Sequence, residues 1–216
     1  MRKIISICRE FGSGGREVGK RLAEILQIPY YDNEIVTQLA ERTQLAEKYV
    51  SQFSEKNLGK VQYFPITVGR SFHRHVQMNP KIMQNINLRI EQNKLLKELA
   101  EKSDCVIVGR CANHILSDFD PLRVFIYAEM DSKIKRCREK APANENVTDK
   151  DFQKRIIEID KTRAQYYKSV TGKPWGEKTD YDIMINTTYY PVKLVAQIVA
   201  LKLLFGEDND SESGSI

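Results

Sequence analysis

Short apolar runs alternate along the chain with segments in which apolar residues recur every three or four positions. Continuous runs predict strands buried in a parallel sheet, and the recurring pattern predicts amphipathic helices. Strands are expected from residue 4 onward and over residues 28–32, 104–110, 123–128 and 181–186. Helices are expected from about residue 16 onward and over about residues 34–49, 81–102, 131–140, 149–167 and 191–205. This alternation predicts an α/β fold whose parallel sheet is covered by helices on both faces.

A glycine-rich loop joins the first strand to the first helix, in the segment Arg9-Glu10-Phe11-Gly12-Ser13-Gly14-Gly15-Arg16-Glu17. Glycines accept positive φ and let the backbone approach an anion, and the first N–H groups of a helix have no partner inside that helix. The loop is therefore predicted to bind phosphate, whereas the plain alternative is a glycine-rich turn without a ligand. The predicted phosphate-binding residues are Gly12, Ser13, Gly14, Gly15, Arg16 and Glu17.

The loop departs from the usual P-loop pattern, which ends in lysine followed by serine or threonine. The spacing of the glycines allows Lys20 at the lysine position, but Arg21 follows it. Alignment of the strand end instead puts Gly15 or Arg16 at that position. Arg16 is the preferred phosphate cation, because a guanidinium group stays charged and can clamp phosphate with two hydrogen bonds.

Composition narrows the class of protein. The chain has 216 residues, 41% of them hydrophobic, which predicts one domain with a proper core over residues 1–206. Residues 207–216 form an acidic tail with nothing to bury and are predicted to be disordered. No apolar run reaches the roughly 18 residues of a membrane span and the chain opens without a signal-peptide pattern, so a cytoplasmic protein is expected. The scattered cysteines lack zinc-site spacing. The net charge of +5 suits small polyanionic ligands, but no basic run predicts a nucleic-acid or membrane surface.

Charged residues stand where two further strands are predicted to end. Asp32 follows the second strand, and Arg110 follows the apolar run that ends at Gly109. Because ligands of parallel sheets bind beyond the carboxyl ends of the strands, Asp32, Arg110 and the glycine loop are predicted to share one site. Two structural alternatives remain, since Asp32 could cap the next helix and Arg110 could form a salt bridge.

Four stretches carry a resemblance to a known family. They are residues 9–19, Tyr31-Asp32-Asn33-Glu34-Ile35, residues 105–112, and Asp160-x-x-Arg163 together with residues 183–188. These stretches resemble the cytidylate kinase-like branch of the nucleoside monophosphate kinases, and the resemblance covers most of the chain. It implies a P-loop NTPase-like three-layer sandwich with a five-stranded parallel sheet. It also implies a helical insert that binds the nucleoside monophosphate at about residues 33–100, and a lid at about residues 141–175.

The resemblance further implies a kinase that transfers a phosphoryl group from ATP, with Mg²⁺, to CMP or dCMP, giving ADP and the nucleoside diphosphate. Such a transfer depends on cations, alignment and exclusion of water, so arginines should dominate the site. The catalytic candidates are Arg16, Arg155 and Arg163, and Asp160 and Arg163 are the lid candidates. The candidates for binding the acceptor are Asp32, Arg110 and Arg89.

Two other functions stay open at this point. A chain without the usual lysine and hydroxyl could bind nucleotide as a regulator and transfer nothing. A P-loop kinase of another small metabolite, with a shikimate-type hydroxyl, would use Asp32 to activate an alcohol. In the classical cytidylate kinases an aspartate follows the Gly-Arg pair, whereas Cys111 follows Arg110 here. The acceptor base, the magnesium ligands and the oligomeric state are left open.

Overall fold

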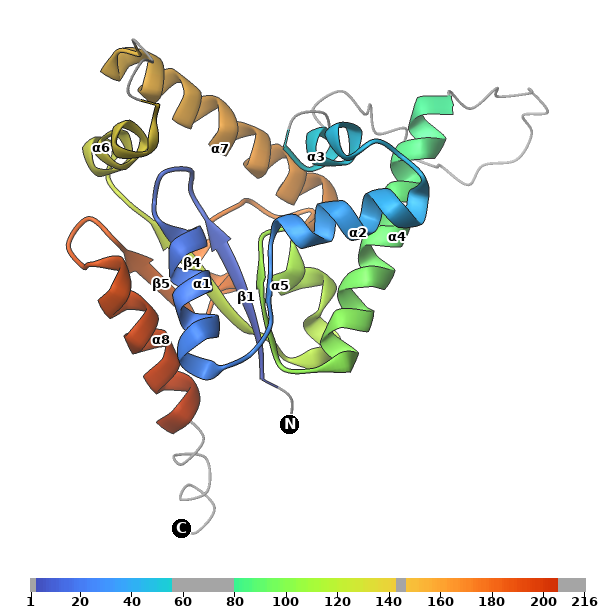
Figure 1. Cartoon of the computed structure of the whole chain (residues 1–216), viewed down its shortest axis with the longest axis horizontal. Coiled ribbons are helices and arrows are strands. Elements are labelled where there is room, and N and C mark those ends of the chain that lie inside the picture. The colour runs from blue at the N-terminus through green and yellow to red at the C-terminus, as the bar shows by residue number, and fades with distance from the viewer. Residues whose placement is uncertain (1–2, 56–79, 143–146, 206–216) are drawn as a thin grey trace.

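Five parallel strands form one sheet in the order β2-β3-β1-β4-β5 (Figure 1). The computed structural model describes residues 3–55, 80–142 and 147–205. The strands are β1 (Ile4–Arg9), β2 (Tyr30–Tyr31), β3 (Cys105–Val108), β4 (Leu122–Tyr127) and β5 (Ile183–Asn186). The predicted α/β fold with a five-stranded parallel sheet is confirmed. Because β1 is central, the loop that follows it lies between the ends of β3 and β4.

Helices cover both faces of this sheet. One face carries α1 (Gly15–Leu26) and α8 (Val192–Phe205). The other face carries α2 (Asn33–Thr43), α4 (Pro80–Lys102) and α5 (Ala112–Ile115). Both faces need a cover because successive side chains of a strand point to opposite faces of the sheet, as strand β1 shows. Ile5 and Ile7 join the core under α1 and α8, while Ile4 joins the core under α2 and α4.

Two further helices, α6 (Met130–Lys140) and α7 (Asp149–Thr171), lie beyond the carboxyl ends of the strands (Figure 1). Phe152, in the first turn of α7, packs in a small cluster with residues of α6. Tyr166 and Tyr167, near the other end of α7, are buried in the main core. The helix therefore spans the edge of the sheet where the glycine loop begins.

The predicted single helix over residues 34–49 is wrong. The structure has α2, which ends at Thr43, and α3 (Glu47–Glu55), separated by Gln44 in the left-handed conformation with φ 55°. The apolar residues Leu39 and Leu45 are six positions apart, a spacing that does not return to the same face of a helix. The chain therefore turns where the helical pattern fails.

Other predicted elements differ only at their ends. Strand β2 has two residues, and β3 ends at Val108, which leaves Gly109 and Arg110 in the loop after it. Two short 3₁₀ helices, Ser117–Phe119 and Lys178–Asp180, complete the described elements. The middle of the expected insert and the expected disordered tail lie outside the described residues. Within the described ranges, none of the helices combines the length and the hydropathy that a bilayer span requires.

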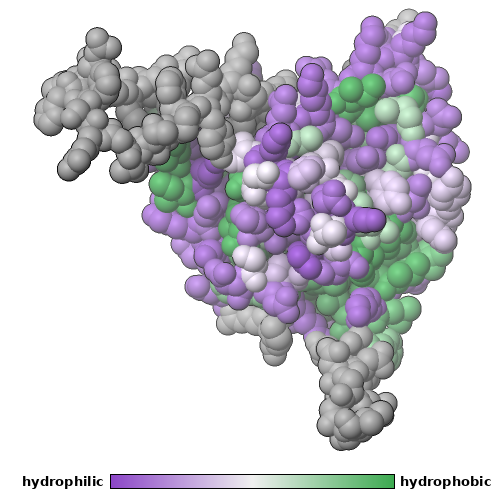
Figure 2. Space-filling view, turned by 180° about the vertical axis from the view of Figure 1, so that it is seen from behind, coloured by the Kyte–Doolittle hydropathy of each residue, from purple (hydrophilic) through white to green (hydrophobic). Residues whose placement is uncertain are grey.

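Apolar side chains also gather on the outer face of α8, within the green region of Figure 2. The exposed residues of this helix include Leu194, Ile198, Leu201, Leu204 and Phe205. The described residues leave this face open to solvent.

Candidate functional site

The glycine loop between β1 and α1 is fixed by bonds within the protein. Gly12 and Gly14 adopt the left-handed conformation, with φ 76° and 83°. The buried Ser13 hydroxyl donates to the carbonyl of Glu10 at 2.9 Å. Thr187, directly after β5, donates to the carbonyl of Ser13 at 2.6 Å. These bonds therefore fix the shape of the loop.

The first turn of α1 opens onto this loop. Gly14 is its N-cap and makes no side-chain capping bond, while the Ser13 hydroxyl accepts from the Gly15 N–H at 3.4 Å. The carboxylate of Glu17 lies 2.9 Å from Arg21 and 3.8 Å from Lys140, so its charge is partly balanced by these two cations. Uncapped N–H groups and the helix dipole together attract an anion.

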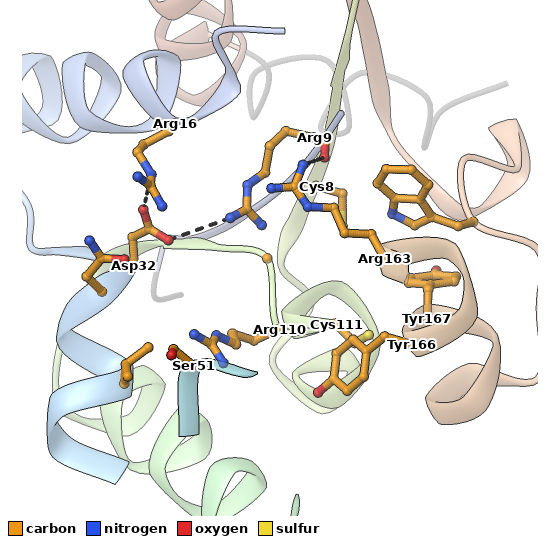
Figure 3. A pocket seen from close by; sticks show the side chains of 14 residues that line it. Cys8, Arg9, Arg16, Asp32, Ser51, Arg110, Cys111, Arg163, Tyr166 and Tyr167 are labelled. Atoms are coloured by element: carbon orange, nitrogen blue, oxygen red, sulfur yellow. Dashed lines mark hydrogen bonds and ion pairs between the residues drawn. The ribbon is translucent and has the colours of Figure 1, made fainter. Parts of the chain in front are cut away.

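Two cavities meet at the loop. The larger, of about 570 Å³, lies between the glycine loop, α6 and α7, and we refer to it as the loop cavity. The smaller, of about 180 Å³, lies at the ends of β1 and β3 against α2, α3 and the end of α7, and we refer to it as the strand-end cavity (Figure 3). Three arginines line both cavities: Arg9, Arg16 and Arg163.

The lining of the loop cavity is strongly basic. It includes six basic side chains, which are Arg9, Arg16, Arg136, Lys140, Arg155 and Arg163. It includes two acidic ones, Glu10 and Glu17. An excess of one charge in a recess with low-dielectric walls concentrates ions of opposite charge. The loop cavity therefore suits a polyanion.

The carboxylate of Asp32 pairs with two of the shared arginines (Figure 3). Its Oδ2 lies 2.5 Å from Nε of Arg16, and its Oδ1 lies 3.6 Å from Nη2 of Arg9. The Tyr30 hydroxyl donates to Oδ2 at 3.3 Å, and burial together with this carboxylate raises the pKa of Tyr30 above its usual range. Asp32 stands at the N-cap of α2, but its side chain makes no capping hydrogen bond. The carboxylate therefore serves the cavity and not the helix end.

The three residues considered for the lysine position have different surroundings. Arg16 lines both cavities. Gly15 cannot carry a side chain, because a β-carbon built there would lie 2.4 Å from Cβ of Arg9. Lys20 is exposed one turn further along α1 and lines neither cavity.

Helix α7 docks on the glycine loop through charged side chains. The guanidinium groups of Arg155 and Arg163 stand over the Phe11 ring, at 5.9 Å and 5.7 Å from its centre. Arg163 also donates to the carbonyl of Arg9 at 3.1 Å. Asp160 accepts from the Phe11 N–H at 2.7 Å and lies 3.5 Å from Arg163, and burial raises the pKa of its carboxyl. The helix and the loop are thus one connected unit.

The predicted acceptor residues are not all brought to the cavities. Arg110 lines the strand-end cavity and adopts the left-handed conformation, with φ 58°. Arg89 lines neither cavity, and its Nη2 donates to the Ser169 hydroxyl at 3.4 Å. Tyr166 and Tyr167 line the strand-end cavity together with Arg110.

Sequence reasoning missed two charged residues of this region. Arg9 ends a buried apolar strand, which is the signal that identified Arg110, so the same rule would have found it. Lys133 of α6 is buried with its amine 3.0 Å from Glu10 and 3.6 Å from Asp160, so it links the loop to α7. Its helix is charged along its whole length, and nothing in the sequence distinguishes this lysine from its neighbours.

Comparison with known proteins identifies a family and a fold. A family model described as the cytidylate kinase-like family matches residues 4–189. Among solved structures, an uncharacterized protein from Eubacterium ventriosum ATCC 27560 shares 27% identity at a TM-score of 0.66, with 94% of this chain and 99% of that chain covered.

Shikimate kinases share the fold at lower identity. The enzyme from Bacteroides thetaiotaomicron has 18% identity and a TM-score of 0.53, over 94% of this chain and 99% of that chain. The enzyme from Acinetobacter baumannii, in complex with shikimate, has 15% identity and a TM-score of 0.52, over 97% of this chain and 96% of that chain. These two comparisons support a common P-loop kinase fold and do not extend to the substrate. A search of curated proteins found no match.

Proposed function

The chain belongs to the cytidylate kinase-like family, and from this premise we propose that it transfers the γ-phosphoryl group of ATP to a nucleoside monophosphate, with CMP and dCMP as first candidates. One observation carries the proposal. Three guanidinium groups, those of Arg9, Arg16 and Arg163, stand where a basic cavity along a glycine loop meets a second cavity at the strand ends. Phosphoryl transfer requires a donor and an acceptor that meet in line at such a place.

Phosphoryl transfer between two nucleotides does not require the protein to form a covalent bond with either substrate. An oxygen of the acceptor phosphate forms a bond to the γ-phosphorus, the bond from that phosphorus to the bridging oxygen breaks, and the bridging oxygen keeps the electron pair on ADP. Because a phosphate oxygen is already a nucleophile, the rate depends on alignment and on cations that match the charge of the transition state. In this proposal Arg16 and Arg163, which line both cavities, supply these cations.

The two cavities divide the substrates between them in this proposal. The N–H groups of residues 12–17 and Arg155 hold the triphosphate of ATP in the loop cavity. Arg110 binds the acceptor phosphate in the strand-end cavity, and Asp32 faces the acceptor nucleoside while it holds Arg16. Residues 141–175 act as the lid, and residues 33–100 include the insert that receives the acceptor.

Mg²⁺ enters this proposal with ATP. Among the described residues, no group of three or more His, Cys, Asp or Glu side chains is arranged to hold a metal ion. Mg²⁺ in kinase sites keeps several waters and uses phosphate oxygens with one or two carboxylates, so the donor set fits an ion carried by the nucleotide. The ion would neutralise phosphate charge when it is bound.

A small alcohol is the second candidate acceptor, and the position of Asp32 favours it. The carboxylate lines a cavity of only about 180 Å³, where it could accept the proton of a hydroxyl. However, Arg16 and Arg9 already occupy this carboxylate, and protonation would break both ion pairs. A nucleoside monophosphate, which needs no base, therefore stays first.

ADP release with a panel of acceptors tests the proposal. The panel is CMP, dCMP, UMP, AMP, shikimate and gluconate, each with ATP and Mg²⁺, and a sample without acceptor measures ATP hydrolysis. The highest rate is expected with CMP or dCMP, and the Arg163→Ala protein, purified in the same way, controls for contaminating kinases. The highest rate with shikimate or gluconate would favour the alcohol. Binding of ATP by calorimetry without ADP from any acceptor would make the chain a nucleotide-binding regulator.

A further inference from the structure

We propose that Arg9 is a catalytic residue, and that its guanidinium group takes the place of the P-loop lysine at the transferring phosphoryl group. The proposal rests on the phosphoryl transfer proposed above and adds a role that the glycine-loop pattern does not give. Arg9 is the last residue of β1, and its side chain reaches both cavities.

Arg9 supplies a cationic side chain beside position 15, where the chain itself has only a glycine. When the strand end is aligned with a P-loop, Gly15 can fall at the lysine position. A β-carbon on Gly15 would lie 2.4 Å from Cβ and 3.1 Å from Cγ of Arg9, so the stem of Arg9 fills the space where a lysine side chain would start. The cation is thus delivered from the strand, and glycine at position 15 makes room for it.

The guanidinium group of Arg9 passes close to a second glycine, Gly109. Gly109, at the end of the neighbouring strand β3, has φ 80°, and a β-carbon there would lie 2.0 Å from Nη1 of Arg9. The absence of a side chain at Gly109 leaves a passage from β1 across the end of β3 toward Asp32, which follows β2. A left-handed glycine at this position therefore has a specific use, which is to let Arg9 through.

Both the backbone and the side chain of Arg9 are held in place by neighbouring residues. The Arg9 carbonyl accepts from Arg163, and the next N–H along the chain donates to Ile126 of β4 at 3.0 Å. The Arg9 side chain is 15% exposed and pairs with Asp32 at 3.6 Å. A cation held in place before the reaction stabilises transition-state charge without the cost of reorganisation. Arg9 and Arg16 share the one carboxylate of Asp32, which leaves one net positive charge for the phosphoryl group.

The competing interpretation is that Arg9 only anchors Asp32. The two roles differ in what they change, because a catalytic cation acts on kcat and a structural ion pair acts on stability. The useful variants are Arg9→Met, which keeps an unbranched apolar side chain without the charge, and Arg9→Lys, which keeps the charge without the planar guanidinium group.

We expect Arg9→Met to lower kcat about a hundredfold or more, by analogy with the loss of one charge-stabilising donor elsewhere. Its Kd for ATP should change less than about threefold, since the interaction is made mainly in the transition state. Arg9→Lys should recover part of the rate. The measurements are ADP release at saturating substrates, calorimetry with ATP, and thermal unfolding of each protein.

Gly109→Ala gives a second route to the same question without removing a charge. Its β-carbon would displace the Arg9 guanidinium group and lower kcat, and the loss should nearly vanish when the change is made in the Arg9→Met protein. Gly176→Ala is the matched control, because Gly176 also has φ 80° but its β-carbon would make only ordinary contact, at 3.4 Å from Phe125. This control should share the loss of thermal stability and keep the rate.

The outcomes separate the two proposals. If Arg9→Met, or Arg9→Lys and Gly109→Ala where the first variant does not fold, keeps kcat within about threefold of the wild-type value, Arg9 is only the partner of Asp32 and the kinase function stands. If the wild-type chain neither binds ATP nor forms ADP with any acceptor, the kinase function fails and this role fails with it.

Discussion

Arg16 and Lys20 lie one turn apart on α1 and differ in what they face. Nε of Arg16 lies 2.5 Å from the buried carboxylate of Asp32, whereas Lys20 is exposed outside both cavities. We expect Arg16→Ala to lower kcat about a hundredfold, because the transferring group loses a cation. Lys20→Ala should stay within about twofold of wild type, as for most exposed positions. Steady-state ADP release measures kcat for both variants. A large loss of kcat in Lys20→Ala would mean that Lys20, one turn further along the helix, binds the phosphate.

Cys137 offers a test of nucleotide binding that needs no catalysis. It is half-buried and lines the loop cavity, whereas Cys8, Cys105 and Cys111 are buried. Burial raises the pKa of Cys8 and Cys105 to about 11 and raises the pKa of Cys137 as well, so access to the reagent decides which thiol reacts first, and each further pH unit raises the small thiolate fraction of each about tenfold. Iodoacetamide should therefore label Cys137 first, and ATP should slow that labelling. Peptide mass spectrometry follows each site, and equal labelling with and without ATP would place the nucleotide elsewhere.

For single residues, the sequence predicts where a side chain lies in the fold better than it predicts which residue that side chain contacts. Arg16, Arg110 and Asp32 could be placed at the edge of the sheet because they follow strands, and they do lie there. The pairing of Arg16 with Asp32 could not be predicted, because it depends on the distance between a helix start and a strand end that are 16 positions apart in the sequence. The same is true of the contact between Arg9 and Gly109.

Helix α7 carries the predicted lid residues, so its first turn should influence the site. Thr148 and Asp151 form a capping box there, in which each side chain accepts a hydrogen bond from the other residue's backbone N–H. Thr148→Ala should cost about 1 kcal/mol. For a chain of this length that corresponds to a fall of roughly 2–4 °C in Tm.

Thr162 of the same helix provides the control for the capping prediction. It lies half-buried in mid-helix, and its hydroxyl donates to the carbonyl of Glu158. Thr162→Ala removes this local bond and adds helix propensity, so Tm should stay the same or rise slightly. Differential scanning calorimetry compares the two proteins, and equal shifts would mean that the capping box contributes nothing.

Long periodic elements were predictable, and breaks without a marker residue were not. Helix α4 and strand β4 were expected within two residues of their observed ends, because their apolar patterns are continuous. The break between α2 and α3 falls at Gln44, which is neither glycine nor proline. A left-handed glutamine is rare enough that composition does not suggest it.

The distribution of charge over the whole molecule predicts how its stability responds to nucleotide. The excess of basic side chains in the loop cavity should give ATP a large and salt-dependent effect. At 100 times its Kd, ATP should stabilise the fold by about 2.7 kcal/mol. For a chain of this length that is a rise in Tm of roughly 5–10 °C.

Two additions to the thermal melts identify the cause of this rise. Adenosine, which lacks phosphate, should have little effect, and an increase in NaCl from 50 mM to 500 mM should reduce the rise with a fixed concentration of ATP, because salt screens the basic cavity. A shift that adenosine reproduces would assign the binding energy to the base and not to the phosphates.

The contact between Gly15 and Arg9 also limits how a loop of this kind can evolve. Lysine introduced at position 15 alone would collide with the arginine stem, and, in the role proposed for Arg9, loss of the arginine alone would remove one of the cations at the transferring group. Neither single exchange yields a working intermediate, so this loop and the lysine-bearing form are separated by a barrier that a lineage crosses only by changing both positions together. Descendants of such a chain would therefore be expected to keep the pair or to lose it as a pair.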